Sequence, residues 1–320
     1  MKRAVRINGF PVMPGLPPWL AFTQGNIFHV KPYSGSDTNT GRSPSGAYKT
    51  LAKALASTTA NQNDVVLLYA ESNTSAQTTD YQATALNWNK DGVHLIGVNS
   101  GVSMSPRSRI AAASAYAAAT PIFTVSANGC YFANLAIYMG VASTAPLGAV
   151  SVTGARNRFD NCHILGMGAA TNDVANAYSL QLSGAEECEF HNCTIGSDRT
   201  ALGAAANSQI RVTALTKNVL FRDCRVRLCS THATNHLFLR AAAASLDGAV
   251  VFQNCVGVNS QSRNVSGLEL TYAFAVAADA GGDVILDANS AFQAADVNSS
   301  NAGNVYAAGA SAGILVPVTQ

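Results

Sequence analysis

The chain has 320 residues and a formal net charge of +2; 12% of its residues are charged and 48% are apolar. This apolar content excludes a disordered chain, and the near-neutral charge gives no overall electrostatic attraction to nucleic acid. No apolar stretch is long enough to cross a bilayer, because Ser114, Thr120 and Pro121 interrupt the alanine-rich segment 110–125.

Residues 1–25 are predicted to form an extended docking arm. Arg6 and Asn8 break the pattern of a secretory signal, and four prolines between positions 11 and 18 prevent a helix. We therefore expect a soluble protein made in a reducing cytoplasm. The basic and aromatic residues that this arm could use to dock on a larger particle are Arg3, Arg6, Phe10 and Trp19.

A short helix is predicted after the arm, over residues 48–55. Ala47, Leu51 and Leu55 are four residues apart, so they form one apolar stripe. The apolar runs 64–69 and 93–98 that follow are predicted to be buried strands.

One motif, Phe-x-Asn/Asp-Cys/Leu, recurs from residue 132 onward. Its copies are Phe132-Ala133-Asn134-Leu135, Phe159-Asp160-Asn161-Cys162, Phe190-His191-Asn192-Cys193, Phe221-Arg222-Asp223-Cys224 and Phe252-Gln253-Asn254-Cys255. The phenylalanines are 27, 31, 31 and 31 residues apart, and Ile285-Leu286-Asp287-Ala288 is a weaker sixth copy. Chance does not explain this regularity, so the motif predicts a repeat architecture.

A second strand is predicted about ten residues before each copy. These segments alternate in hydrophobicity, as a strand with one buried face does. They cover residues 122–125, 150–152, 180–182, 210–212, 237–239 and 274–276. Each repeat therefore contains a strand, a tight bend, a second strand and a longer variable loop.

A repeat this short cannot bury its apolar face alone, so it must stack on its neighbours, with equivalent residues about 4.8 Å apart. Three internal columns follow from this stacking. They are an aromatic stack of Phe132, Phe159, Phe190, Phe221 and Phe252, a polar ladder of Asn134, Asn161, Asn192, Asp223 and Asn254, and a small apolar column of Leu135, Cys162, Cys193, Cys224 and Cys255.

The chain has seven cysteines and no Cys-x-x-Cys pair. An odd number argues against a disulfide framework, and the spacing is poor for zinc. Stacked cysteines would also have parallel Cα–Cβ vectors, which suit a disulfide badly. We expect reduced thiols in the core, with bridges or a bound metal as the less favoured alternative.

The Phe-x-Asn-Cys ladders resemble those of right-handed parallel β-helix proteins of the pectate-lyase-like architecture. The lead-in is similar too, because Phe28–Pro32 runs through Gly35-Ser36-Asp37 into the short helix. The resemblance implies an all-β, single-stranded solenoid whose open end is capped by this helix, as a terminal coil requires. It implies three parts: the arm 1–25, the β-helix domain 26–290, and a C-terminal tail or small capping segment 291–320.

By the same resemblance, lyases of this architecture bind calcium through several carboxylates on an outer face and use a lysine or arginine as base. Two columns of the repeat are predicted to point outward. They are Ala133, Asp160, His191, Arg222 and Gln253 beside the ladder asparagines, and Ala136, His163, Thr194, Arg225 and Val256 after the cysteine column. Neither column clusters the carboxylates that calcium needs. We predict no catalytic residue, no cofactor and no metal site.

Hydrolysis would need two carboxylates about 5–9.5 Å apart. The densest group of candidates is Glu186, Glu187, Glu189 and His191, with Asp198 and Arg199 downstream. Consecutive glutamates at the start of a strand are more often a solvated rim. The stacked Asp160, His191 and Arg222 are interpreted as cross-strand pairs, each worth up to about 1 kcal/mol.

Three functions are compatible with these observations. The favoured one is a non-catalytic structural protein of a bacteriophage virion, of the capsid-decoration or head-fibre kind, because the low charge, the alanine-rich loops and the arm resemble β-helix proteins of tailed phages. It would be a homo-oligomer, with a trimer favoured, and would be assembled in the host cytoplasm. We expect it to dock on other virion proteins such as the major capsid protein. The outward side chains of Leu220 and Val251 and the loops of small residues suit such contacts. The alternatives are a tailspike-like polysaccharide depolymerase, hydrolase or lyase, and an adhesin that binds a host surface glycan.

Overall fold

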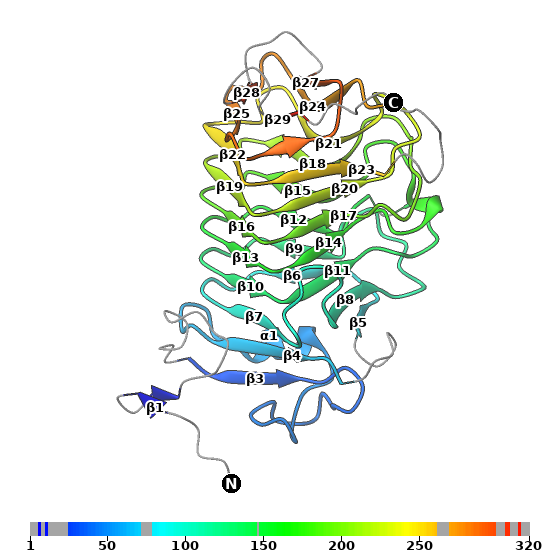
Figure 1. Ribbon diagram of the computed structural model, residues 1–320. Helices are drawn as coiled ribbons and strands as arrows, with labels where there is room; N and C mark the ends of the chain where they lie inside the picture. The colour runs from blue at the N-terminus through cyan, green and yellow to red at the C-terminus, as the bar shows by residue number, and fades with distance from the viewer. Residues whose placement is uncertain are drawn as a thin grey trace.

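The computed structural model describes residues 25–71, 79–145, 147–260 and 269–298, together with short strands at 6–7, 10–11, 305–307 and 313–314. From Val65 to Asn298, each turn of the chain adds one strand to each of three parallel sheets (Figure 1). The fold is therefore the predicted right-handed parallel β-helix. No helix among the described residues combines the length and apolar character that a membrane crossing requires.

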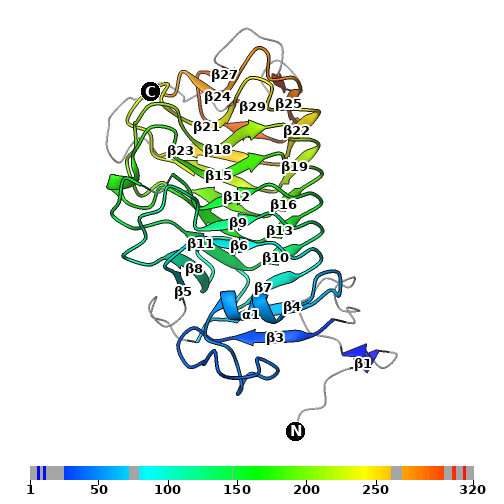
Figure 2. The same ribbon diagram turned by 180° about the vertical axis from the view of Figure 1, so that it is seen from behind.

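The strands of the solenoid fall into three sheets, here called sheets 1, 2 and 3. Sheet 1 contains β3 (Ile27–Val30), β4 (Val65–Tyr69), β7 (His94–Val98), β10 (Tyr131–Ala133), β13 (Arg158–Asp160), β16 (Glu189–His191), β19 (Val219–Arg222), β22 (Ala249–Gln253), β25 (Asp283–Leu286) and β28 (Val305–Ala307). Sheet 2 contains β5 (Thr79–Gln82), β8 (Ser108–Ala112), β11 (Leu135–Tyr138), β14 (His163–Leu165), β17 (Thr194–Gly196), β20 (Arg225–Leu228), β23 (Val256–Asn259), β26 (Ala291–Phe292) and β29 (Gly313–Ile314). Sheet 3, seen in Figure 2, contains β6 (Leu86–Trp88), β9 (Phe123–Val125), β12 (Val150–Val152), β15 (Tyr178–Ser183), β18 (Asn207–Ala214), β21 (His236–Ala241), β24 (Tyr272–Val276) and β27 (Asp296–Asn298).

The phenylalanine positions of the repeat are vertical neighbours in sheet 1. Phe132, Phe159, Phe190, Phe221 and Phe252 pair in register from β10 to β22. Their rings are fully buried and stack with centroids 4.6–4.9 Å apart and planes within 18°. The aromatic column is therefore continuous through five coils.

The polar ladder marks the bend from sheet 1 into sheet 2. Asn134, Asn161, Asn192, Asp223 and Asn254 all have φ between 48° and 56°. Asparagine and aspartate tolerate this left-handed conformation better than other non-glycine residues. Nδ2 of Asn161 donates to Oδ1 of Asn134 at 2.8 Å, and Nδ2 of Asn192 donates to Oδ1 of Asn161 at 3.1 Å. The ladder thus joins adjacent coils and also permits the turn.

The cysteine column lies just inside this bend. The thiols of Cys162, Cys193, Cys224 and Cys255 each contact the carbonyl oxygen of the ladder phenylalanine one coil earlier, at 3.2–3.7 Å. All seven cysteines are buried and free. Burial raises the pKa of the Cys193 and Cys224 thiols well above the ordinary value.

The third strand of each coil is the main difference from the sequence prediction. Sheet 2 begins directly after the cysteine column, where the sequence analysis expected a loop. Its strands are three to five residues long up to β23, and a positive-φ residue separates each motif strand of sheet 1 from the next strand of sheet 2. The alternating pattern is therefore interrupted before it can indicate a separate strand.

The weak sixth copy is shifted by one residue from its predicted register. Leu286 pairs with Phe252, and Ile285 pairs with Val251. Leu286 is buried and Ile285 is half-buried, so the inward side chain is the leucine. The sheets also continue past residue 290, because β26 and β27 pair with β23 and β24. Residues 291–298 are thus part of the solenoid.

A short helix, α1 (Leu51–Ser57), lies beside the first strands, where the cap was predicted. The Thr50 hydroxyl accepts from the Lys53 backbone N–H at 3.2 Å and caps the helix, which therefore begins at Leu51, three residues later than predicted. Leu51, Ala54 and Leu55 are the buried residues of the helix and join the main core. Ala47 is buried as well, although it precedes the helix.

The predicted arm falls largely outside the described residues. Its described backbone comprises β1 (Arg6–Ile7) and β2 (Phe10–Pro11), which pair antiparallel. Arg3, Trp19 and the side chains of Arg6 and Phe10 lie outside the described residues, so their docking role stays a prediction.

Candidate functional site

A groove of about 880 Å³ runs over the outer face of sheet 2. Residues of six consecutive strands of this sheet, from β5 to β20, line it. One wall comes from the segment between β7 and β8, and another from the segments that follow β11 and β17. The solenoid therefore places side chains from distant repeats along one open channel.

Two tyrosines form the aromatic part of this groove. Tyr81 and Tyr138 each pair with Ala111, so they share one outward column with a small side chain between them. Tyr81 is 50% exposed and Tyr138 is 39% exposed, although most aromatic rings of the described chain are buried. Their ring surfaces are therefore available to a ligand.

Glycines make room for the Tyr138 ring. A Cβ at Gly140 would lie 1.9 Å from its Cε1 atom, and a Cβ at Gly168 would lie 2.6 Å from its Cε2 atom. The Tyr138 hydroxyl also lies 3.4 Å from the Gly168 carbonyl oxygen. The ring is thus held in place at the edge of the groove.

Arginines dominate the charge of the groove. Arg109, Arg199 and Arg227 line it, whereas Asp198 is the one carboxylate among its lining residues. Asp198 accepts a hydrogen bond from Arg227, so its charge is matched locally. The groove therefore presents an excess of positive charge.

The charges of Arg109 and Arg199 both act on Tyr138. Burial raises the pKa of Tyr138, and the positive charges of Arg109 and Arg199 oppose that rise. Burial also lowers the pKa of Arg109, and nearby Arg107 lowers it further. Two guanidinium groups therefore lie within electrostatic reach of one partly exposed aromatic ring.

One wall of the groove is fixed by contacts that span many coils. The Ser105 backbone N–H donates to Nδ1 of His163 at 3.1 Å, and Nη1 of Arg225 donates to the Ser103 hydroxyl at 3.3 Å. Nε2 of His163 donates to the Gly196 carbonyl oxygen at 3.0 Å. Burial, aided by Arg227 and Arg109, lowers the pKa of His163. The neutral imidazole thus joins this wall to sheet 2.

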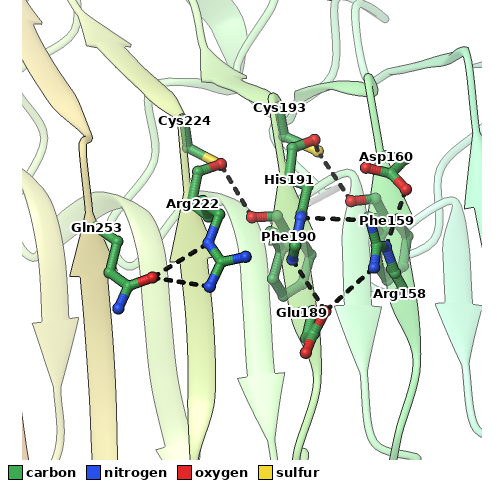
Figure 3. A network of polar contacts seen from close by, with 10 residues as sticks. All are labelled: Arg158, Phe159, Asp160, Glu189, Phe190, His191, Cys193, Arg222, Cys224 and Gln253. Atoms are coloured by element: carbon green, nitrogen blue, oxygen red, sulfur yellow. Dashed lines mark hydrogen bonds and ion pairs between the residues drawn. The ribbon is translucent and has the colours of Figure 1, made fainter.

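The predicted mixed charge ladder lies on a different face, the outer face of sheet 1 (Figure 3). Nε of Arg158 is 2.9 Å from Asp160, and its Nη1 is 3.5 Å from Glu189. Glu189 also contacts Nε2 of His191 at 2.9 Å. Arg158 therefore contacts Asp160 within β13 and Glu189 across to β16, and Glu189 and His191 contact each other within β16.

The remaining members of that ladder are paired as well. Nε and Nη2 of Arg222 donate to Oε1 of Gln253 at 3.1 and 3.0 Å (Figure 3). Burial, followed by the charge of Arg158, lowers the pKa of His191. Cross-strand pairing, the interpretation given to Asp160, His191 and Arg222 from the sequence, holds for Arg222 with Gln253 and for His191 with Arg158, whereas Asp160 contacts Arg158 within its own strand.

The predicted acidic group does not form one cleft. Glu187 lies in the turn before β16 and pairs with Arg156 at 2.8 Å, while His191 is on sheet 1 and Asp198 follows β17 of sheet 2. The described part of the chain therefore does not form the acidic cleft that the depolymerase alternative would need at Glu187, His191 and Asp198. These residues are close in sequence, but the bend at Asn192 carries the chain from sheet 1 to sheet 2. In the described residues, no group of three or more His, Cys, Asp or Glu side chains could hold a metal ion.

Most residues of the groove were not predicted from the sequence. The predicted outward column contains His163 and Arg225, whereas Tyr138, Leu165 and Arg227 lie in the column two residues further along each strand. Following the alternation of sheet 2 for one more step would have found the second column. Tyr81 and Arg109 lie before the first motif copy, so the repeat gave them no register.

Comparisons with known proteins identify the class of fold. No protein family model and no curated protein matches the chain. Among solved structures, pectate lyase Pel9A is 12% identical with a TM-score of 0.53, covering 92% of this chain and 78% of that one. A pectin methylesterase in complex with a hexasaccharide is 15% identical, with a TM-score of 0.52. Pectin methylesterase PemA from Erwinia chrysanthemi is also 15% identical, with a TM-score of 0.53. Each of these two matches covers 85% of this chain and 80% of the other protein. The chain thus has the pectate-lyase-like β-helix fold, and identities this low establish the fold alone.

Proposed function

We propose that this chain binds an extended anionic polysaccharide in the groove on sheet 2, without cleaving it. The observation that carries the proposal is that the partly exposed Tyr138 ring lines the same groove as the guanidinium groups of Arg109 and Arg199. A sugar ring can pack its apolar face on an aromatic ring, and guanidinium groups hold carboxylates through paired hydrogen bonds. The groove offers both kinds of contact in one place.

The length of the groove suits a linear polymer. Its lining residues come from six adjacent strands, and strands are about 4.8 Å apart, so the channel extends about 24 Å along the solenoid axis. Tyr81 and Tyr138 are two strand positions apart on this line. A chain of sugars can therefore contact both rings.

Binding fits the groove better than hydrolysis. Hydrolysis of a glycosidic bond generally uses two carboxylates, one as acid and the other as base or nucleophile. Asp198 is the single carboxylate that lines the groove, and Arg227 and the Ser260 hydroxyl already contact it.

The virion location, the trimer and the capsid partner predicted from the sequence stay predictions. A glycan-binding groove is compatible with them, since a particle-bound adhesin would also need one. Mass spectrometry of purified phage particles tests the location, and the absence of this chain from any particle would contradict it.

Titration calorimetry with two probes tests the binding proposal. Hexagalacturonate is the anionic probe and cellohexaose is the neutral one, and we expect heat of binding with the anionic probe alone. Tyr138→Ala and Arg199→Ala should each weaken binding about tenfold, equivalent to about 1.4 kcal/mol.

Two control variants carry the same kinds of change outside the groove. Tyr33→Ala removes a tyrosine that is 62% exposed, and Arg222→Ala removes an arginine of sheet 1; both should bind normally. Equal loss in the controls, or no heat with either probe, would contradict the proposal. New reducing ends or unsaturated products during the titration would instead favour the depolymerase.

A further inference from the structure

The outer face of sheet 1 changes character along the solenoid. At the coils of β4, β7 and β10 its outward side chains are mainly apolar, and one coil later they become Arg158 and Asp160. The apolar set consists of Val65, Leu67, Ile96, Tyr131 and Ala133, with Ile27 and Tyr69 beside them. These residues form a cluster separate from the main core, which takes the alternate positions such as Val66 and Leu95.

These outward residues are buried, although they face away from the core. Val65 is 1% exposed and Leu67 is 2% exposed. On the same face, the side chains of Arg158 and Glu189 are 36% and 43% exposed. An outward valine or leucine in a sheet becomes this inaccessible only when another piece of chain lies over it. Something therefore covers the face as far as β10, and the cover ends at β13.

The two described segments nearest this face, the chain after β3 and helix α1, pack against the main core instead. The segment that follows β3 lies against the open end of the core, because the Arg42 guanidinium is 4.4 Å from the Phe28 ring centroid and Tyr48 bonds to the His29 backbone. The buried side chains of α1 belong to the main core. Neither element accounts for the burial of Val65 and Leu67.

We propose that residues 1–24 pack over the outer face of sheet 1 from β3 to β10, so that the arm first binds its own solenoid. They connect through Gly25 and Asn26 to β3, the edge strand at this end (Figure 1). The Asn26 carbonyl accepts from the Val65 backbone N–H at 2.8 Å, so this point of the chain lies at the start of β4. The covering segment therefore enters at the border of the apolar face.

Length and composition support the same occupant. Because Arg6–Ile7 and Phe10–Pro11 pair as β1 and β2, the reach is counted over residues 12–24, whose thirteen residues span about 43 Å when extended; the face from β3 to β10 spans three strand spacings, about 14 Å. The segment is rich in large apolar side chains and contains no acidic residue. Pro14, Pro17 and Pro18, which follow β2, favour an extended conformation that needs few backbone partners, and this suits packing on a sheet face by side chains. The inference concerns a different face from the glycan groove and does not depend on it.

Site-specific photocross-linking of the full chain identifies the occupant. Ile96 is replaced by p-benzoylphenylalanine, the protein is irradiated as a dilute monomer, and the linked peptide is identified by mass spectrometry. We expect a link within the monomer to a peptide from residues 1–24. The control places the same photoreactive group at Val251, an outward half-buried residue of β22, where no link to residues 1–24 should form.

Trp19 gives an independent readout in the same full-length chain. Trp88 is fully buried, so the fluorescence difference between wild type and Trp19→Phe isolates Trp19. Leu67→Lys should increase acrylamide quenching of Trp19 at least threefold, and Val251→Lys should leave it unchanged. A link from position 96 to another region or to a second copy would overturn the proposal. So would Trp19 quenching in wild type as fast as that of free tryptophan.

Discussion

Phe190 is the middle ring of the aromatic column, and its removal tests whether the stack adds stability beyond burial. Its ring is fully buried and stacks on Phe159 and Phe221, with both centroid distances at 4.8 Å. Truncation of a buried phenylalanine to alanine lowers the free energy of unfolding by about 3–5 kcal/mol. The backbone hydrogen bonds of sheet 1 hold the strands on both sides in place, so they cannot move in to fill the cavity. The substitution also removes two ring-stacking contacts, each worth about 0.5–1.5 kcal/mol. We expect Phe190→Ala to cost about 5 kcal/mol or slightly more.

Phe238 provides the matched comparison. It is also fully buried, but its ring contact is a single edge-on one with Phe292, at 5.3 Å. Phe238→Ala should therefore cost about 3–4 kcal/mol, so the stack contributes a difference of about 1–2 kcal/mol. Urea unfolding followed by circular dichroism measures the free energy of unfolding of both variants. The midpoints can be compared if the dependence of this free energy on urea concentration is the same as in the wild type. Equal losses for the two variants would refute the reasoning that the column adds stability as a stack.

Three further predictions concern titration and reactivity. Burial raises the pKa of Asp80 to about 6, which is above its value in the unfolded chain. The free energy of unfolding should therefore fall by about 3 kcal/mol as the pH rises from about 4 to 6, and urea unfolding of Asp80→Asn should lack this fall. Burial lowers the pKa of His94 and of His236 to about 4, which is below the value of histidine in the unfolded chain. Each histidine should therefore lower the free energy of unfolding by up to about 3 kcal/mol as the pH falls from about 6.5 to 4. Acid unfolding of His236→Gln should show a weaker pH dependence than that of the wild type. The seven buried thiols should resist iodoacetamide at pH 8 and react completely in urea, as mass spectrometry would show; rapid labelling of the folded protein would contradict their burial.

The interior of the solenoid could be predicted because it repeats. A phenylalanine must meet a phenylalanine one coil later, and an asparagine must adopt the same left-handed bend, so the sequence itself shows the vertical neighbours. The prediction failed where the repeat weakens, as at Leu286, whose neighbour Ile285 has equal apolar character. In that case only the burial of one side chain decides the register.

The groove could not be predicted in the same way, because its residues do not repeat. Arg227 contacts Met104 across 123 positions of sequence, and no periodicity connects these two residues. Tyr81 and Arg109 belong to early coils that lack the motif. Outer positions are free to vary from coil to coil, since stacking constrains only the inward side chains. For that reason, function on this fold has to be read from the structure.

The two outer faces also differ in how their charges are used. On sheet 1, Arg158 lies among Asp160, Glu189 and His191, so opposite charges cancel over a short distance. On sheet 2, three arginines line the groove with a single carboxylate, and the excess positive charge is concentrated beside Tyr138. Fields from paired charges fade within a few ångströms, whereas an unbalanced cluster in a groove attracts an anion from solution. The same stacking rule therefore produces one face on which opposite charges alternate and one groove in which positive charge is in excess.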